Sequence, residues 1–143
     1  MNGSIVCGVD ESADSQAALG VAARLAERLD ARLVLAHVAE FAPSHMPTMM
    51  SATTDGQKKA GERLLDQVAE EAGLPNAAKR AVVGFPAERL ADLADEEDAE
   101  LIVVGSRGRG RFKAAFLGSV SNSLVGVARC PVLIVPPAAA AAP

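Results

Sequence analysis

Short runs of mainly apolar residues alternate along this chain with longer stretches of helical periodicity. The apolar runs cover residues 5–9, 33–38, 81–83, 101–104 and 132–135. None of them alternates apolar with polar side chains, which is typical of strands buried on both faces of a sheet. We therefore expect a single-domain α/β fold, an open doubly wound five-stranded parallel sheet with helices on both faces.

Local signals predict where the helices begin. Ser12 is placed to be the N-cap of the first helix, and Pro86 suits the first turn of the third. Residues 39–53 contain two prolines and are predicted to be irregular. Thr54 and Gln57 then have the spacing of a capping box at the start of the second helix.

Length and charge limit the domain organisation and the partners. The chain has 143 residues, half of them hydrophobic, which predicts one domain with a sizeable core. We expect this domain to cover residues 1–136 and an Ala/Pro tail at 137–143 to be disordered. The formal net charge of −4 argues against general nucleic-acid binding, which requires a basic face.

Three features favour a cytoplasmic location. No apolar run approaches the ~20 residues that span a bilayer, so we expect no membrane partner. The opening residues lack the basic and then apolar pattern of a signal peptide. Cys7 and Cys130 lie far apart, in or beside apolar runs, so we expect buried thiols in a reducing compartment rather than a disulfide or a metal site.

The ends of two predicted strands indicate where a ligand would bind. In open α/β sheets, ligands bind outside the carboxyl ends of the strands, where the winding reverses. Conspicuous polar or glycine-rich sequence follows the first strand at Asp10 and the fourth strand from Gly105 onward. We infer that these two strands are neighbours at the point of reversal.

The segment of residues 105–119 carries the clearest chemistry. Its three closely spaced glycines allow positive φ and the close approach of a ligand, and successive N–H groups in such a turn form an anion-binding nest. Gly118 and Ser119 then open a helix, whose N-terminus favours phosphate. The glycines are Gly105, Gly108 and Gly110, and the cations among and after them are Arg107, Arg109, Arg111 and Lys113. The segment therefore predicts a polyphosphate site.

Other interpretations of these residues stay open. The segment could be a surface loop with solvated arginines, although its position after a buried strand favours a ligand site. We expect the hydroxyls of Ser119 and Ser121 to be available to phosphate, and Asp10 either to contact the ligand or to cap the first helix. His37 is more typical of a hydrogen-bonded core histidine than of a catalytic base. We expect the acidic residues 95–98 to form a solvated helix end. Neither the P-loop motif nor the dinucleotide-binding glycine fingerprint is present.

The glycine spacing resembles the universal stress protein family, and specifically its ATP-binding branch. In that branch a glycine, two residues, a glycine and nine residues precede a glycine followed by serine or threonine, and Gly105, Gly108, Gly118 and Ser119 fit every position. Further similar landmarks lie at residues 9–15, 35–38, 84–87 and 130–135. Two positions depart from the family, since Arg111 stands where glycine is common and Val127 where histidine is frequent.

The resemblance implies a Rossmann-like sheet of the adenine-nucleotide alpha hydrolase-like type that binds ATP and Mg²⁺. Asp10 would face the ribose or a nucleotide-bound magnesium ion, and the backbone of Val38 would meet the adenine edge. The residues implied in nucleotide binding are Gly8, Asp10, Val38, Gly105, Arg107, Gly108, Arg109, Gly110, Gly118, Ser119, Val120 and Ser121.

The expected function is that of an ATP-binding regulator in stress signalling, acting as a homodimer on a protein partner that the sequence does not name. The apolar edge strand Val132–Val135 invites pairing with a second copy. No nucleophile–base set, paired carboxylates or P-loop lysine is evident, so we expect at most slow ATP hydrolysis. The alternatives are an AMP or cyclic-nucleotide module, an adenylate-forming enzyme, and a nucleotide-free interaction module.

Overall fold

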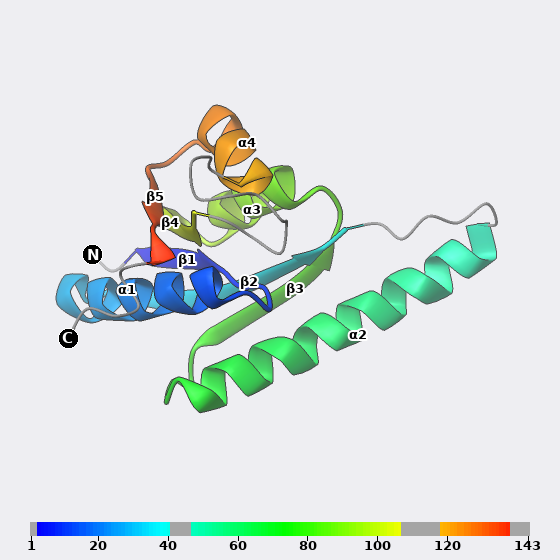
Figure 1. Cartoon of the computed structure of the whole chain (residues 1–143), viewed down its shortest axis with the longest axis horizontal. Coiled ribbons are helices and arrows are strands. Elements are labelled where there is room, and N and C mark those ends of the chain that lie inside the picture. The colour runs from blue at the N-terminus through cyan, green and yellow to red at the C-terminus, as the bar shows by residue number, and fades with distance from the viewer. Residues whose placement is uncertain (1–2, 41–46, 107–117, 138–143) are drawn as a thin grey trace.

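Five strands and four helices alternate along the chain in the computed structural model, which describes residues 3–40, 47–106 and 118–137, with only the backbone at 47–53 (Figure 1). The strands are β1 (Ser4–Gly8), β2 (Arg32–Ala39), β3 (Ala78–Val83), β4 (Ala99–Gly105) and β5 (Val132–Val135). The helices are α1 (Ala13–Leu29), α2 (Pro47–Glu71), α3 (Pro86–Glu96) and α4 (Ser119–Val127). The predicted order of elements is confirmed.

All five strands are parallel, and they lie in the order β3-β2-β1-β4-β5. β1 and β4 are therefore neighbours, as the polar residues at their ends predicted. The chain winds outward from β1 through β2 to β3 and then returns to the other side of β1 for β4 and β5. This reversal places the carboxyl ends of β1 and β4 side by side, where an open α/β sheet binds its ligands.

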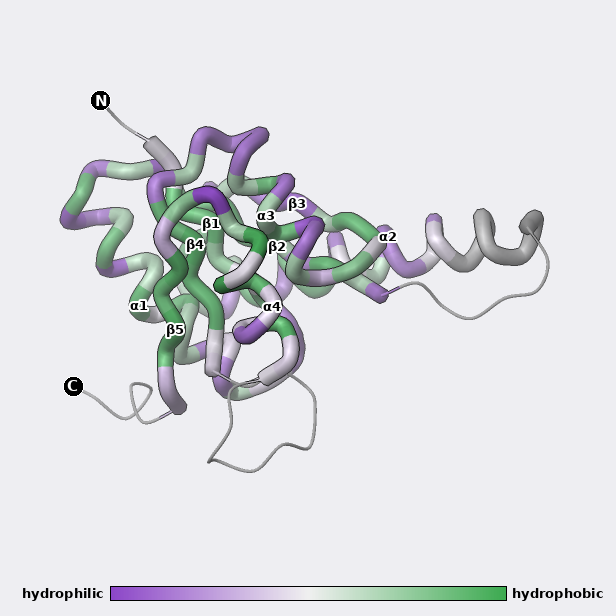
Figure 2. Tube along the Cα trace, turned by 90° about the horizontal axis from the view of Figure 1, so that it is seen from above, coloured by the Kyte–Doolittle hydropathy of each residue, from purple (hydrophilic) through white to green (hydrophobic). Residues whose placement is uncertain are grey.

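The sheet is covered on both faces, α1 and α2 lying on one side and α3 and α4 on the other (Figure 1). Alternate side chains of each central strand enter the two cores: Ile5 and Cys7 contact the first pair of helices, Val6 contacts the second pair, and all three are fully buried. Figure 2 shows the hydrophobic strands surrounded by helices with hydrophilic residues along their length. Burial on both faces explains why these strands carry no polar alternation.

Two helix starts agree with the sequence. Ser12 is the N-cap of α1, and its Oγ accepts a hydrogen bond of 3.2 Å from the N–H of Ser15. Pro86 is the first residue of α3, a position where the missing N–H of proline costs no hydrogen bond.

The predicted start of the second helix is wrong. α2 begins at Pro47 and includes residues 47–53, which the sequence analysis assigned to an irregular stretch. Thr54 lies inside this helix, so Thr54 and Gln57 form no capping box, and Gln57 Nε2 instead donates a 2.6 Å hydrogen bond to the carbonyl of Glu40. Pro47 is the first residue of the helix, a position that is compatible with proline, and is therefore not the loop signal that the sequence analysis predicts.

The predicted solvated end of α3 is confirmed for Asp95, Glu96 and Asp98, which are exposed, whereas Glu97 is half-buried. The side chain of Glu97 is 14% exposed and accepts hydrogen bonds from Arg32 (2.6 Å) and Arg80 (2.5 Å). Asp95 pairs with Arg129. The hydrogen bond to Glu96 and, after it, the interactions with Glu97 raise the pKa of Arg80. These arginines come from β2, β3 and the turn before β5, so local charge patterning did not indicate the pairs.

The two cysteines are free thiols, as expected. Cys7 is buried, whereas Cys130 is only half-buried, which corrects the expectation that both are buried. Within residues 3–40, 47–106 and 118–137, no helix is long and apolar enough to cross a membrane. The predicted tail at 137–143 extends beyond the last described residue, Pro137, and stays a prediction.

Candidate functional site

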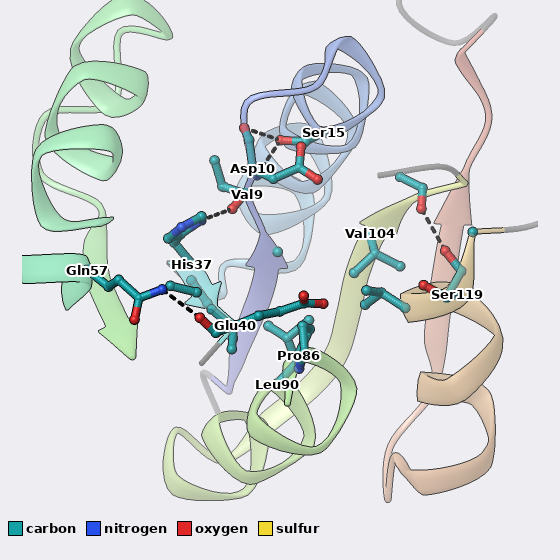
Figure 3. Close-up of a pocket in the computed structure, with 18 residues that line it drawn as sticks. Val9, Asp10, Ser15, His37, Glu40, Gln57, Pro86, Leu90, Val104 and Ser119 are labelled. Atoms are coloured by element: carbon teal, nitrogen blue, oxygen red, sulfur yellow. Dashed lines mark hydrogen bonds between the residues drawn. The ribbon is translucent and has the colours of Figure 1, made fainter. Parts of the chain in front are cut away.

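A cleft of about 550 Å³ opens at the carboxyl ends of β1, β2 and β4, beside the start of α4 (Figure 3). It lies at the point where the winding of the sheet reverses. Its size falls within the ~300–1,000 Å³ that is typical of small-molecule sites. Three walls carry its polar groups, formed by the β1–α1 turn, by β4 with α4, and by β2 with α2, while Pro86 and Leu90 of α3 complete the lining.

The β1–α1 turn places Asp10 at the cleft. Its Oδ1 accepts a 2.7 Å hydrogen bond from the N–H of Ser12, and its N–H donates to Ser15 Oγ at 3.0 Å. Because Ser12 is the N-cap of α1, the alternative that Asp10 caps this helix is wrong. Within the described part of the chain, Asp10 Oδ2 has no hydrogen-bond partner, so it is available to a cation or a hydroxyl group.

The second wall is formed by the end of β4 and the start of α4. Gly118 is the N-cap of α4 and supplies no side chain to cap it. The N–H of Gly118 itself donates to the carbonyl of Ser106 at 2.6 Å. Among the described residues, no side chain caps the N–H groups of the first turn of α4, and these groups carry the positive end of the helix dipole. Since Ser119 and Val120 line the cleft, this wall favours an anionic group.

Ser121 does not have the free hydroxyl that we expected. It is 2% exposed, and its Oγ donates a 2.9 Å hydrogen bond to the carbonyl of Gly105. That bond uses the only proton of the hydroxyl, so Ser121 fastens α4 to the end of β4. The hydroxyl of Ser119 is exposed at the cleft and can donate to a ligand.

The third wall combines β2 and α2. His37 Nδ1 lies 2.7 Å from the carbonyl of Val9 and must carry the proton, because a carbonyl can only accept. His37 is thus hydrogen-bonded as predicted, but it is half-buried at the cleft rather than in the core. Gln57 Oε1 is a buried acceptor with no partner within the described ranges. Glu40 adds an exposed carboxylate to this wall, so the wall offers acceptors where α4 offers donors.

The structure brings together every implied binding residue that it describes. These are Gly8, Asp10, Val38, Gly105, Gly118, Ser119, Val120 and Ser121. The other four, Arg107, Gly108, Arg109 and Gly110, lie outside the described residues, as do Arg111 and Lys113. That all of these residues bind a nucleotide stays a prediction.

Ten further lining residues were not foreseen as site residues. Most are apolar strand residues or side chains such as Gln57 and Leu90, which reach the cleft from the sides of helices, and no local sequence pattern indicates that approach. They are Val9, Ser15, Ala36, His37, Ala39, Glu40, Gln57, Pro86, Leu90 and Val104.

The groups that line the cleft limit what kind of ligand it can bind. In the described ranges no group of three or more His, Cys, Asp or Glu side chains could hold a metal ion. A metal ion at this site would therefore need ligands from the bound molecule in addition to Asp10. The uncapped α4 N-terminus on one side and the acceptors of β2 and α2 on the other suit an elongated ligand with one anionic end.

The fold and the cleft together define an open α/β ligand-binding domain with its site at the switch point of the sheet. The sequence pattern of the universal stress protein family matches residues 1–136, and the chain belongs to this family. A Thermus aquaticus universal stress protein, that of the QAH/OAS sulfhydrylase 3' region, is 34% identical over 134 residues, which cover 92% of this chain and 97% of that protein.

Solved structures agree with this membership. The universal stress protein UspA from Lactobacillus plantarum superposes with a TM-score of 0.79 at 25% identity, over 93% of this chain and 97% of the other. A universal stress protein in complex with cAMP superposes with a TM-score of 0.71 at 30% identity, over 93% of this chain and 96% of that one.

Proposed function

We propose that this protein binds an adenine nucleotide in the cleft, with Mg-ATP as the principal ligand, and acts as a nucleotide-dependent regulator rather than as an efficient enzyme. The observation that carries the proposal is the uncapped N-terminus of α4, which opens into a cleft at the switch point of the sheet. The glycine spacing of the ATP-binding branch supports the same ligand, because Gly105 and Gly118 both line that cleft.

The polarity of the cleft orients the nucleotide in this proposal. Phosphate oxygens accept hydrogen bonds from the first turn of α4 and from the hydroxyl of Ser119. The base lies toward Val38, against the wall that offers acceptors. Asp10, between the two ends, takes a ribose hydroxyl or one position on a magnesium ion. The phosphates supply most of the ligands of that ion, which is the usual arrangement for Mg²⁺.

A regulatory role follows from the chemistry of the described side chains. Among the described residues, no hydrogen bond joins His37 to a hydroxyl or thiol of the cleft, and its Nδ1–H is donated to the carbonyl of Val9. We expect ATP hydrolysis to be slow or absent. We propose that the output is a surface change sensed by a protein partner, and that the protein is a cytoplasmic homodimer joined at β5, which is an edge strand.

A cyclic nucleotide is the second candidate ligand. The universal stress protein solved with cAMP is 30% identical to this chain, and the match covers almost the whole of both proteins. A cyclic phosphate carries one negative charge and offers fewer acceptors than a triphosphate. The relative affinities for Mg-ATP, AMP and cAMP therefore decide between these ligands.

Two measurements test the proposal. Mass spectrometry of the small molecules released on denaturation is expected to detect an adenine nucleotide, and calorimetric titration is expected to give tightest binding for Mg-ATP. Replacing Gly118 and Ser119 together by alanine should weaken Mg-ATP binding by about tenfold, since hydrogen bonds to charged groups contribute about 1.5–3 kcal/mol.

The matched control is the double variant Ser123→Ala/Gly126→Ala, which makes the same two kinds of substitution in α4 away from the cleft. A Cβ atom on Gly126 would meet no atom within 4 Å, so this variant should bind as the wild type does. Wild-type protein that neither contains nor binds any adenine nucleotide would refute the proposed function. Equal Mg-ATP affinity in the Gly118/Ser119 variant and the wild type would refute the assigned phosphate end.

A further inference from the structure

We propose that Asp14 is a positioning residue for the anionic end of the ligand: through Ser106, it holds the N-terminus of α4 at the cleft. This inference rests on the proposed nucleotide-binding function. It concerns a buried carboxylate that lies behind the lining residues, where a ligand does not reach it.

Asp14 is a charged residue in the interior of the protein. It lies in the first turn of α1 and is 7% exposed. Its Oδ2 accepts a hydrogen bond from Ser106 Oγ at 3.3 Å, which joins α1 to the residue that follows β4. Burial of a carboxylate costs free energy unless hydrogen bonds compensate for it, so a specific role is expected for this side chain.

Ser106 is the residue through which Asp14 acts. Its N–H donates to the carbonyl of Val135 at the end of β5 (2.9 Å), and its carbonyl accepts from the N–H of Gly118 (2.6 Å). Ser106 therefore contacts three elements at once, namely α1 through its hydroxyl, β5 through its N–H and α4 through its carbonyl. A shift of Ser106 would move Gly118, the N-cap of α4, with it.

The neighbouring contacts hold the same junction. A Cβ atom on Gly105 would lie 2.8 Å from the carbonyl carbon of Asp14, so β4 and α1 touch through their backbones at this point. On its other side, the carbonyl of Gly105 accepts the hydrogen bond from Ser121. The end of β4 is thus held between the first turns of α1 and α4.

Polar contacts add to the apolar packing of α4, in which Leu124 and the half-buried Val120 pack against the same core as α3. This helix has nine residues, and only Ser121 and Leu124 are buried. The hydrogen bonds of Gly118 to Ser106 and of Ser121 to Gly105 hold the first turn of α4 at the end of β4, and Asp14 in turn holds Ser106.

The contact with Ser106 requires an acceptor oxygen on the side chain of residue 14. A carboxylate behind a phosphate site repels the ligand, whereas asparagine keeps an acceptor for Ser106 without that repulsion. Asp14→Asn should therefore retain binding, and Asp14→Ala should not. For the partner residue, Ser106→Thr keeps the hydroxyl and Ser106→Ala removes it.

The test compares calorimetric affinities for Mg-ATP and for adenosine, which has the same base and ribose but no phosphate. In Asp14→Ala and Ser106→Ala we expect Mg-ATP to bind about tenfold more weakly, while adenosine affinity changes less than twofold. Asp14→Asn and Ser106→Thr should lie within about threefold of the wild type. The double alanine variant should lose less affinity than the sum of the two single losses, because both changes break the contact that the two residues share.

Ser4→Ala is the matched control, because Ser4 is buried and its Oγ donates to the carbonyl of Glu97 at the opposite end of the sheet. It should lower stability and leave Mg-ATP affinity unchanged. Unchanged Mg-ATP affinity in Ser106→Ala, or an equal loss for Mg-ATP and adenosine, would overturn the inference. If wild-type protein binds neither compound, the proposed function itself fails. Should Asp14→Ala not fold, the two Ser106 variants decide the question.

Discussion

Gly61 of α2 lies directly against the ring of His37, so that a Cβ atom on Gly61 would come within 2.9 Å of His37 Cδ2. The same atom would lie 3.2 Å from the Cβ of Ala81 on β3. The absence of a side chain at Gly61 thus allows α2 to approach the β2 wall of the cleft, where His37 donates its hydrogen bond to Val9.

We predict that Gly61→Ala destabilises the fold. An alanine must displace the His37 ring or α2, and overpacking of this kind costs about 1–3 kcal/mol, more than the ~1 kcal/mol gained in helix propensity. Urea denaturation measures the difference. Gly56→Ala in the same helix is the matched control, since a Cβ there meets nothing within 4 Å. It should stabilise the protein by about 0.5–1 kcal/mol, and equal behaviour of the two variants would contradict the prediction.

Gly105→Ala should be more harmful than Gly61→Ala. At Gly105 the new Cβ would meet backbone atoms of Asp14 at 2.8 Å. A helix backbone cannot relieve such a clash by changing rotamer, as a side chain can. We expect a loss of about 3 kcal/mol or more, at the upper end of the range for overpacking, measured by thermal and urea denaturation. Gly126→Ala serves as the control for introducing a methyl group. A Gly105→Ala protein as stable as the wild type would mean that α1 and β4 are not in close contact.

Burial of the Cys7 thiol predicts a pH dependence of stability. Desolvation raises its pKa from 9.0 to about 12, so the folded form keeps the proton that the unfolded chain loses. This contribution is fully present below pH 9 and is lost as the pH rises toward 12. The slope approaches about 1.4 kcal/mol per pH unit. Cys7→Ala should remove this part of the slope, as shown by comparing the unfolding free energies of both proteins at pH 8 and pH 10.5. Parallel pH profiles would contradict the prediction.

Arg80→Ala should weaken the contacts at the acidic end of α3. The Arg80 side chain is 33% exposed and bonds both Glu96 and Glu97, so solvent screening reduces the effect. We expect a loss of about 1 kcal/mol that shrinks at high salt, measured by urea denaturation at two ionic strengths. Arg63→Ala, an exposed arginine of α2, should change stability by less than ~0.5 kcal/mol. A loss that is independent of salt would indicate that Arg80 acts through packing alone.

The sequence analysis correctly predicted features that depend on neighbouring residues. Val132–Val135 is β5 with the bounds expected, and Ser12 caps α1 through a residue three positions away. Asp10 and Gly105 were correctly placed at one edge of adjacent strands. Periodicity, capping and the geometry of parallel sheets act over short distances or through simple rules, so a single sequence reveals them.

Contacts between distant residues were decided only by the tertiary structure. The Ser121 hydroxyl donates its hydrogen bond to the carbonyl of Gly105, sixteen positions away. Glu97 pairs with Arg32 across 65 positions, and Gln57 reaches the carbonyl of Glu40 from a helix that begins earlier than predicted. A hydroxyl, carboxylate or amide can have many partners within a chain, and only the folded arrangement selects one. The sequence by itself therefore determined the elements, their order and the location of the cleft, whereas packing decided which polar groups face the cleft and which hold its walls in place.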